Sequence, residues 1–318
     1  MKKHTVVSMF SGCGGMDLGF LGGFDANGKH YAKNPFEIVW ANDLNPNACR
    51  TYEANLGHQI HVGSVWDHID TMPESCDVVI GGFPCQDISI NGKRAGVAGA
   101  RSGLYKAMVD AVEKMRPRIF VAENVRGLLY AYNKDSLAKV LSDFTAIGYD
   151  VSIKLYHAAA YGVPQKRERV MIVGVLNGSV PFEHPTPLLE KPDWVSSRSA
   201  IEDLEGVDQD PEFSHVWSLA RASSDQGSRV LNPDVPAHTI RAECHGNNQF
   251  HYKLPRRISM REAARFQTFP DKFIFHAKLR ETERMIGNAV PPVLGWHVAG
   301  AVLECLEKTE GAVSIAAE

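Results

Sequence analysis

The sequence lacks the features that would assign it to several specialised classes. Its 318 residues contain no run of about 18 apolar residues, which argues against a membrane-spanning helix. The six cysteines form no C-x-x-C pair, so neither a disulfide framework nor a zinc ribbon is indicated, and a reducing cytoplasm fits. The N-terminal residues, Met-Lys-Lys-His, lead directly into a Val-rich segment and do not resemble a signal peptide. Internal repeats and the G-x-G-x-x-G pattern of nicotinamide-dependent oxidoreductases are absent.

An excess of charge of one sign is lacking too. The formal net charge is −3, which disfavours a protein that coats nucleic acid through bulk positive charge but is compatible with a local basic cleft. Hydrophobic residues make up 44% of the chain and charged residues 22%, a balance that indicates a folded globular protein. At roughly 150 residues per domain, the length predicts about two domains.

The first half of the chain alternates apolar runs with helical patterns. Continuous apolar runs predict buried strands, and the spacing of apolar residues over 104–115 predicts a helix. Such alternation indicates an α/β fold with a parallel sheet covered by helices on both faces, in which ligands bind at the carboxyl ends of the strands. The expected strands are 4–10, 36–41, 76–80, 118–122 and 170–175.

The composition changes after residue 180. Residues 181–212 contain nine acidic and two basic side chains, which we interpret as a solvated face. Residues 221–261 contain seven basic and three acidic side chains around a polar turn at 243–249, which makes a surface that reads a nucleic-acid groove plausible.

Helical signals return near the C-terminus. Ser259 and Glu262 form the pattern of a capping box ahead of an expected helix over 263–269, which Pro270 would end. The Pro291-Pro292 pair can open a last helix, over about 293–306.

Two polar segments near expected strand ends suit a bound nucleoside. The segment Phe10-Ser11-Gly12-Cys13-Gly14-Gly15 lies between a strand and a helix, where glycines let the backbone approach a ligand closely. Asp43 follows the second strand, where α/β folds place an acid for ribose hydroxyls. Taken alone, the glycines indicate only a turn, and Asp43 could equally cap a helix.

Three further segments carry reactive side chains. Cys85 follows Gly-Phe-Pro on a constrained loop, although a lone cysteine is more often a small buried hydrophobe. The polar stretch 89–103 after it could close over a substrate as a lid. Glu123 lies at the end of a buried strand, as either a satisfied acid or an acid/base group. Arg167 and Arg169 alternate into an apolar strand, where they would need anionic partners unless they form a surface run.

In this order, the segments resemble the DNA (cytosine-5)-methyltransferases over nearly the whole chain. The matching motifs are Phe-Ser-Gly-Cys-Gly-Gly (10–15), Pro-Cys-Gln (84–86), Glu-Asn-Val (123–125), Gln-x-Arg-x-Arg (165–169), Arg-Glu-Ala-Ala-Arg-Phe-Gln (261–267) and Gly-Asn-Ala-Val-Pro-Pro (287–292). The resemblance implies a Rossmann-like sheet that binds S-adenosyl-L-methionine, with a smaller, irregular target-recognition domain. It divides the chain into a catalytic domain (1–180), a recognition domain (181–255), a hinge helix region (256–283) and a return to the catalytic domain (284–318).

The resemblance also implies roles for individual residues. Cys85, Glu123, Arg167 and Arg169 would be catalytic. Those expected to bind the cofactor are Phe10, Ser11, Gly12, Cys13, Gly14, Gly15, Asp43, Leu44, Ser64, Val65, Pro84, Leu104, Asn288 and Ala289. Those expected to bind DNA are Gln86, Ser89, Asn91, Lys93, Arg94, Arg101, Arg241, His245, Asn247, Asn248 and Arg257. The chain departs from the family at Ser8, Leu44 and Ser64, where relatives often have Asp, Trp and Asp.

These residue types suit methyl transfer to carbon 5 of cytosine. A Cys85 thiolate that adds at carbon 6 makes carbon 5 nucleophilic, and a protonated Glu123 can donate to N3. Arg167 could hold the base O2 or the Cys85 loop, and Arg169 a phosphate or Glu123. The target cytosine must leave the duplex stack, which costs a few kcal/mol.

Two other functions and a metal site are compatible with parts of the sequence. A transfer-RNA cytosine-5 methyltransferase would use the same chemistry, and a non-catalytic binding paralogue the same fold. A zinc site at His238, Cys244, His245 and His251 matches no standard spacing, so a turn with hydrogen-bonding histidines is preferred and no metal is expected. The expected partners are double-stranded DNA and, functionally, a cognate restriction endonuclease. We expect a monomer in the bacterial cytoplasm.

Overall fold

The computed structural model describes residues 2–84, 103–219, 229–242 and 249–316, with side chains up to residue 312. Several of the expected site residues therefore lie outside the described residues. These are Cys85, Gln86, Ser89, Asn91, Lys93, Arg94, Arg101, His245, Asn247 and Asn248.

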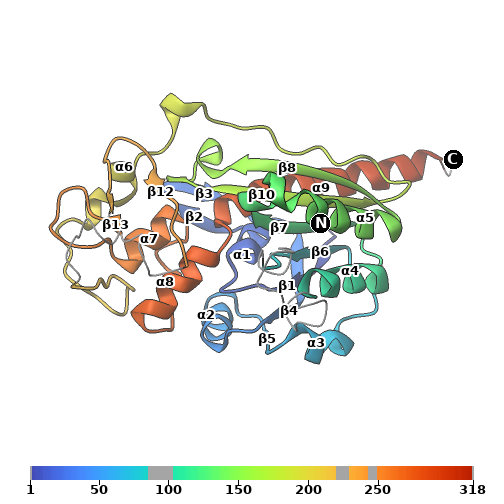
Figure 1. The fold of residues 1–318 in the computed structure, drawn as a ribbon, viewed down its shortest axis with the longest axis horizontal. Coiled ribbons are helices and arrows are strands. Elements are labelled where there is room, and N and C mark those ends of the chain that lie inside the picture. The colour runs from blue at the N-terminus through green and yellow to red at the C-terminus, as the bar shows by residue number, and fades with distance from the viewer. Residues whose placement is uncertain (1, 85–102, 220–228, 243–248, 317–318) are drawn as a thin grey trace.

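A seven-stranded sheet forms the centre of the larger part of the molecule (Figure 1), in the order β5-β4-β1-β6-β7-β10-β8. The strands are β1 (His4–Met9), β4 (Phe36–Asp43), β5 (His61–Val62), β6 (Val78–Gly81), β7 (Ile119–Val125), β8 (Tyr149–His157) and β10 (Glu168–Leu176). From β5 to β7, neighbouring strands are parallel. The α/β fold and the five expected strands are confirmed, with shifts of a few residues at their ends.

The expectation of a purely parallel sheet is wrong at β10. This strand runs antiparallel to both β7 and β8. The ten residues that join β8 to β10, 158–167, are too few for a crossover helix, so the chain turns back on itself. Strand β8 has no continuous apolar run, which is why it was not predicted from the sequence.

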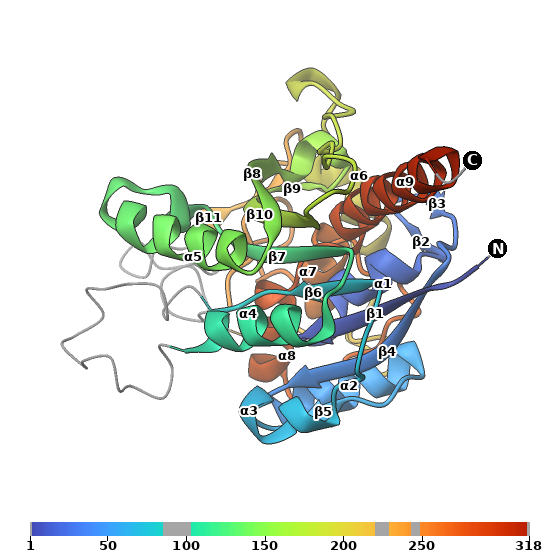
Figure 2. The same cartoon turned by 90° about the vertical axis from the view of Figure 1, so that its right-hand side faces the viewer.

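Helices cover both faces of the sheet (Figure 2). The helices α1 (Gly15–Leu21), α2 (Pro46–Leu56) and α9 (Pro292–Ala316) share one apolar core with Val6 and Val78. The helices α3 (Val65–His68), α4 (Leu104–Met115) and α5 (Lys134–Ala146) share a second core with Val7 and Val79. Adjacent strand residues therefore enter opposite cores, as alternation in a sheet buried on both sides requires.

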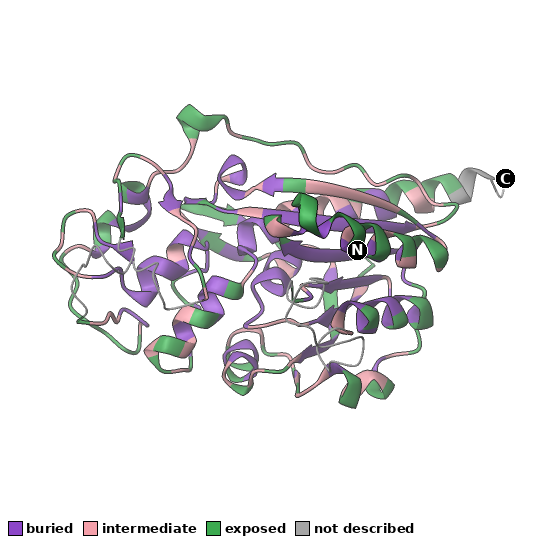
Figure 3. Cartoon of the chain, in the orientation of Figure 1, coloured by how far each residue is buried: buried purple, intermediate pink, exposed green. Residues whose placement is uncertain are grey.

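The strands β2 (Phe24–Ala26) and β3 (Lys29–Tyr31) form a separate antiparallel pair. Other short elements gather at one end of the sheet (Figure 1). They are the short strands β11 (Arg229–Val230), β12 (Ala237–His238) and β13 (Gln249–Phe250), with α6 (Ser197–Ile201), α7 (Met260–Phe266) and α8 (Leu279–Asn288). β12 pairs with β9 (Gln165–Lys166), next to the start of β10. In the acidic segment 181–212, which leads to this end, eight of the nine acidic residues are exposed and Glu205 is half-buried, whereas Ser197, Ala200, Ile201 and Leu204 are buried (Figure 3). This agrees with its interpretation as a solvated face.

The C-terminal helices match their sequence signals in part. The capping box of Ser259 and Glu262 is present at α7, but the helix ends at Phe266, ahead of Pro270. α9 is longer than expected. In the described part of the chain, the segment Leu279–Ala312, which comprises α8 and most of α9, is long and apolar enough to cross a membrane, contrary to expectation, but 72% of its most apolar window is buried inside the protein. These helices therefore pack in the core of the folded chain.

Candidate active site

A cavity of about 580 Å³ opens at the carboxyl ends of β1, β4, β6 and β7. This is the edge of an α/β sheet where ligands are expected, and the volume lies in the range of ~300–1,000 Å³ typical of small-molecule sites. Its walls come from the glycine-rich loop after β1, the ends of the parallel strands and the end of α8. The cavity therefore joins segments from both ends of the chain.

The glycine-rich loop is held in a strained, closely packed form. Phe10 has a left-handed backbone (φ 56°), which is unfavourable for a residue with a side chain. A Cβ on Gly15 would lie 2.4 Å from the carbonyl oxygen of Val290, so only glycine lets the segment after α8 pack against the loop. The loop and this segment together form one side of the cavity.

Asp43 holds the loop in place. Its Oδ2 accepts a hydrogen bond from the Gly12 amide (2.8 Å) and its Oδ1 one from the Asn45 amide (2.8 Å). Burial raises the pKa of this carboxyl, and the two amides oppose the rise. Asp43 thus has the backbone hydrogen bonds of a turn residue and also lines the cavity, where it could meet a ribose.

Twelve of the fourteen residues expected to bind the cofactor line this cavity, which brings together segments up to 279 positions apart. Cys13 and Gly14 do not line it. The Cys13 thiol is buried behind the loop, 3.9 Å from the carbonyl oxygen of Met285, and burial raises its pKa. The twelve are Phe10, Ser11, Gly12, Gly15, Asp43, Leu44, Ser64, Val65, Pro84, Leu104, Asn288 and Ala289.

Glu123 and Arg169 form a buried ion pair in the same cavity. The Arg169 Nε lies 2.6 Å from the Glu123 Oε1, and each side chain is about 10% exposed. Burial raises the pKa of Glu123, and Arg169 and Arg167 oppose the rise without cancelling it. The site therefore favours the protonated acid more than water does.

The register of β10 creates this pair. Arg169 lies opposite Val125 and Met171 lies opposite Glu123, so the Arg169 and Glu123 side chains are diagonal neighbours on one face. Of the two partners proposed for Arg169, the structure provides Glu123.

The loop that leads to Cys85 packs against Glu123. A Cβ on Gly82 would lie 2.9 Å from the Glu123 Oε2, closer than side chains tolerate. The Asn124 Nδ2 donates to the carbonyl oxygen of Phe83 (3.0 Å), which attaches this loop to β7. Residues 82–84, which directly precede Cys85 in the sequence, therefore lie beside the buried Glu123.

Arg167 has a different environment from the one expected. Its side chain is fully buried, and it donates to the carbonyl oxygens of Ile240 (2.9 Å), Gly287 (2.8 Å) and Ala289 (2.9 Å). None of these hydrogen bonds goes to the described loop residues 82–84. Because both terminal nitrogens are used by the backbone, we correct the assignment of Arg167 from a group that touches the base to one that joins three segments around the cavity.

A second, cationic pocket of about 210 Å³ lies beside β9 and β12. None of the described residues that line it is acidic, and nearby Arg229 and Lys166 help burial to lower the pKa of His238. Arg241, an expected DNA-binding residue, is part of it. The residues of the cationic pocket are Lys166, Arg229, His238, Thr239, Arg241 and Gln249.

The expectation that Arg257 binds DNA is wrong. It is only 8% exposed, and its guanidinium donates to the Glu283 Oε1 (2.6 Å) and the Ser218 Oγ (3.2 Å). The positive charge of Arg257 is therefore paired with Glu283 inside the protein.

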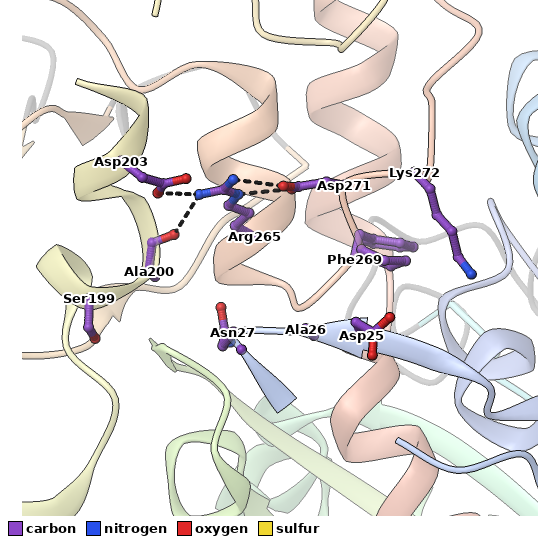
Figure 4. Close-up of a pocket in the computed structure, with 12 residues that line it drawn as sticks. Asp25, Ala26, Asn27, Ser199, Ala200, Asp203, Arg265, Phe269, Asp271 and Lys272 are labelled. Atoms are coloured by element: carbon purple, nitrogen blue, oxygen red, sulfur yellow. Dashed lines mark hydrogen bonds and ion pairs between the residues drawn. The ribbon is translucent and has the colours of Figure 1, made fainter. Parts of the chain in front are cut away.

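A third hollow, of about 420 Å³, contains none of the expected site residues (Figure 4). There Arg265 pairs with Asp271 (2.9 and 2.7 Å) on one side and with Asp203 on the other. The pairs connect α7 to the segment after α6, so the hollow is a structural junction.

The suggested zinc residues do not gather among the described residues, where no group of three His, Cys, Asp or Glu side chains is arranged for a metal. His251 instead accepts hydrogen bonds at Nδ1 from the amides of Lys253 and Leu254, as a turn-forming histidine does. Cys244 and His245 lie outside the described residues.

Sequence reasoning missed some residues of the main cavity. Asp17, Arg284 and Gly63 also line it. Only Asp17 carried a usable signal, an acidic residue within the otherwise apolar segment 15–21. The other two are ordinary loop and helix-surface residues in the sequence.

Comparison with known proteins agrees with this geometry. The family model "C-5 cytosine-specific DNA methylase" matches residues 4–224 and 211–304. The chain is 36% identical to the type II methyltransferase M.NgoFVII of Neisseria gonorrhoeae, over 92% of this chain and 84% of that protein. It is 34% identical to the type II methyltransferase M.MthTI of Methanothermobacter thermautotrophicus, over 95% of this chain and 98% of that protein.

Solved structures share the fold. The Schizosaccharomyces pombe (S. pombe) Dnmt2 methyltransferase superposes with a TM-score of 0.69 at 18% identity, covering 96% of this chain and 99% of that one. The Entamoeba histolytica methyltransferase EhMeth superposes with a TM-score of 0.68 at 15% identity, again over 96% and 99%.

Proposed function

The chain belongs to the C-5 cytosine-specific DNA methylase family, and we propose that it methylates carbon 5 of a cytosine flipped out of a specific duplex sequence. Family membership makes the protein a DNA cytosine-5 methyltransferase, a fold and an activity that the sequence motifs predicted. The observation that carries the detailed assignment is the buried Glu123–Arg169 pair, which faces the same cavity as the glycine-rich loop.

The cavity has room and polar groups for S-adenosyl-L-methionine, the methyl donor that the family implies, which supports it as the cofactor. Asp43 would accept from the ribose hydroxyls, the 10–15 loop would hold the methionine part, and Leu44, Ser64 and Val65 would border the adenine. Asn288 would close the opposite wall. When bound, this group supplies a methyl on a positively charged sulfur, which an electron-rich carbon can take.

The protein's task is to make carbon 5 of cytosine electron-rich. We assign Cys85 as the nucleophile that adds at carbon 6, because a thiolate is strongly nucleophilic at neutral pH. Protonated Glu123 donates to N3 and stabilises the charge that this addition places on the ring. After methyl transfer, a base removes the proton on carbon 5 and the Cys85 sulfur leaves.

Arg169 and Arg167 position Glu123 and adjust its pKa, and neither is assigned a contact with the base. Arg169 contacts Glu123 directly and orients its carboxyl. Arg167 acts through the backbone of Ile240, Gly287 and Ala289, and its charge also lowers the pKa of Glu123. The two arginines thereby limit the rise in the Glu123 pKa that burial causes.

We assign DNA binding to the segments 181–255 and 89–103. The cationic pocket supports the assignment of 181–255, because Lys166, Arg229 and Arg241 suit a backbone phosphate. His245, Asn247 and Asn248 would contact the base edges. The segment 89–103 would fill the gap that the flipped base leaves, and further DNA contacts would come from Gln86, Ser89, Asn91, Lys93, Arg94 and Arg101.

The description of the family model, a DNA methylase, favours DNA over transfer RNA as substrate. The combination of Cys85 with Glu123 and Arg169 argues against a non-catalytic paralogue. We propose that the chain works as a monomer in the bacterial cytoplasm, as the modification enzyme of a cognate restriction endonuclease.

The test is methylation of a plasmid by the purified protein with S-adenosyl-L-methionine, read by conversion-based sequencing. We expect 5-methylcytosine at one cytosine of one recurring sequence, and none with Cys85→Ser. Methylation of transfer RNA alone, or of cytosines without a common context, would contradict the proposal.

Covalent trapping tests the Cys85 step separately. A duplex with 5-fluorocytosine at the target should form a denaturation-resistant adduct, because fluorine cannot leave as a proton. Proven DNA binding and methylation without any adduct would refute the covalent role of Cys85.

A further inference from the structure

Asp17 is a buried acid that the mechanism above does not use. It lies in the first turn of α1, is fully buried, and lines the main cavity. Its Oδ1 accepts a hydrogen bond from the hydroxyl of Tyr52 (2.9 Å). Its Oδ2 has no hydrogen-bond partner among the described residues.

An unpaired buried carboxylate oxygen is costly, and native proteins rarely leave one without a purpose. Burial raises the pKa of Asp17 to about 6, while the hydroxyls of Ser8 and Tyr52 oppose the rise. The charged group that acts on it is Asp43, which has the same sign and raises the pKa further. The protein thus supplies Asp17 with hydroxyls but with no cation from its described part.

The Ser8 hydroxyl lies near enough to Asp17 to lower its pKa, but the hydrogen bond that it forms is with Ser11 and not with the Oδ2. The Ser8 Oγ and Ser11 Oγ lie 2.8 Å apart, and the Ser11 hydroxyl reaches the Ser8 carbonyl oxygen (3.1 Å). Tyr52 is committed to the Oδ1. The remaining acceptor is therefore left for a donor that enters the cavity.

We propose that Asp17 binds the α-ammonium group of the methionine part of S-adenosyl-L-methionine. This rests on the proposed function, which places that group in the cavity. The cofactor carries two positive charges, a sulfonium and an ammonium, and only the ammonium has N–H groups to donate to the Oδ2. A charge-assisted hydrogen bond of this kind satisfies both the orphaned acceptor and the buried charge.

The experiment compares binding of three ligands by titration calorimetry. They are S-adenosyl-L-methionine, S-adenosyl-L-homocysteine, and the homocysteine analogue with hydrogen in place of the α-amino group. We expect the wild-type protein to bind S-adenosyl-L-homocysteine at least about tenfold more tightly than the deaminated analogue, the effect of a charge-assisted hydrogen bond. Asp17→Asn should lose most of this preference by weakening only the ligands with the amino group. Tyr52→Phe, which keeps the carboxylate, should retain it.

Each other outcome has a defined meaning. Equal weakening of all three ligands by Asp17→Asn would show a purely structural role and overturn the inference. Weakening of S-adenosyl-L-methionine alone would assign Asp17 to the sulfonium, which also overturns it. If Asp17→Asn does not fold, absence of a preference in the wild-type protein refutes the inference without any variant. Failure of the wild-type protein to bind any of the three ligands would instead reject the proposed cofactor, and the inference with it.

Discussion

Replacement of Arg167 by Met tests most directly whether this side chain holds backbone segments together rather than contacting the base. Arg167 is fully buried and connects Ile240, Gly287 and Ala289, which lie 73, 120 and 122 positions away along the chain. Met keeps an unbranched apolar stem but removes every donor. The carbonyl oxygen of Ala289 would retain a hydrogen bond from the Gln267 Nε2, whereas those of Ile240 and Gly287 would lose their Arg167 donor.

The expected loss of stability follows from these two carbonyls. A buried acceptor that loses its partner costs about 1–3 kcal/mol, so two cost roughly 2–6 kcal/mol. Relief from burying a guanidinium, whose pKa burial lowers well below its ordinary value, offsets part of this. We therefore expect the free energy of unfolding to fall by about 2–4 kcal/mol. At an unfolding entropy of ~2.1 cal/mol/K per residue, this chain should lose roughly 3–6 °C in Tm.

The assay is thermal and urea unfolding of Arg167→Met beside Lys166→Met. Lys166 is the exposed neighbour, and its replacement should change the free energy of unfolding by no more than ~0.5 kcal/mol. Arg167→Met with unchanged Tm but abolished methylation would refute the correction, because it would mean that Arg167 acts on the reacting base.

The remaining predictions concern the acid, the DNA surface and the division of the chain. Glu123→Gln should slow methylation by ~10²–10⁴-fold while cofactor and DNA binding persist; a loss below tenfold would make Glu123 structural. Burial raises the pKa of Glu123 above its ordinary 4.5, so the protonated form that donates to N3 is present at low pH and is lost as pH rises through the pKa of Glu123 in the folded protein. The contribution of the raised pKa to the free energy of unfolding is lost over the same pH range. The alkaline fall in rate measured for the wild type should therefore be absent from Glu123→Gln. Lys166→Ala combined with Arg229→Ala should lower the slope of log DNA affinity against log salt by ~1.8, whereas Lys272→Ala, outside the cationic pocket, should not change it. A chimera with residues 185–252 from a relative should methylate the relative's sequence; methylation of the original site would show that the recognition segment is misplaced.

Local patterns gave reliable expectations where the cause is local. Apolar runs predicted β1, β4, β6, β7 and β10, because burial on both faces demands apolar residues throughout. The capping box at Ser259 and Glu262 formed as expected, since its hydrogen bonds join residues three apart. The order of short motifs was also enough to indicate the family.

Roles of individual charged residues could not be predicted in the same way. Arg167, Arg169 and Arg257 look alike in the sequence, yet one holds backbone carbonyls, one pairs with Glu123 and one pairs with Glu283. The difference depends on which acceptors meet each guanidinium, and those acceptors lie 26 to 122 positions away.

The sequence by itself determined the α/β alternation, the strand ends that carry the motifs, and the residue types that methyl transfer needs. Only the tertiary structure decided that β10 runs antiparallel, which sets Arg169 diagonally across from Glu123. It also decided that Gly15 packs against Val290 and that one oxygen of Asp17, at the cavity wall, has no hydrogen-bond partner within the described ranges. The physical reason is that apolar periodicity encodes which side of an element is buried, whereas the register between strands and the closure of distant segments arise from packing of the whole chain.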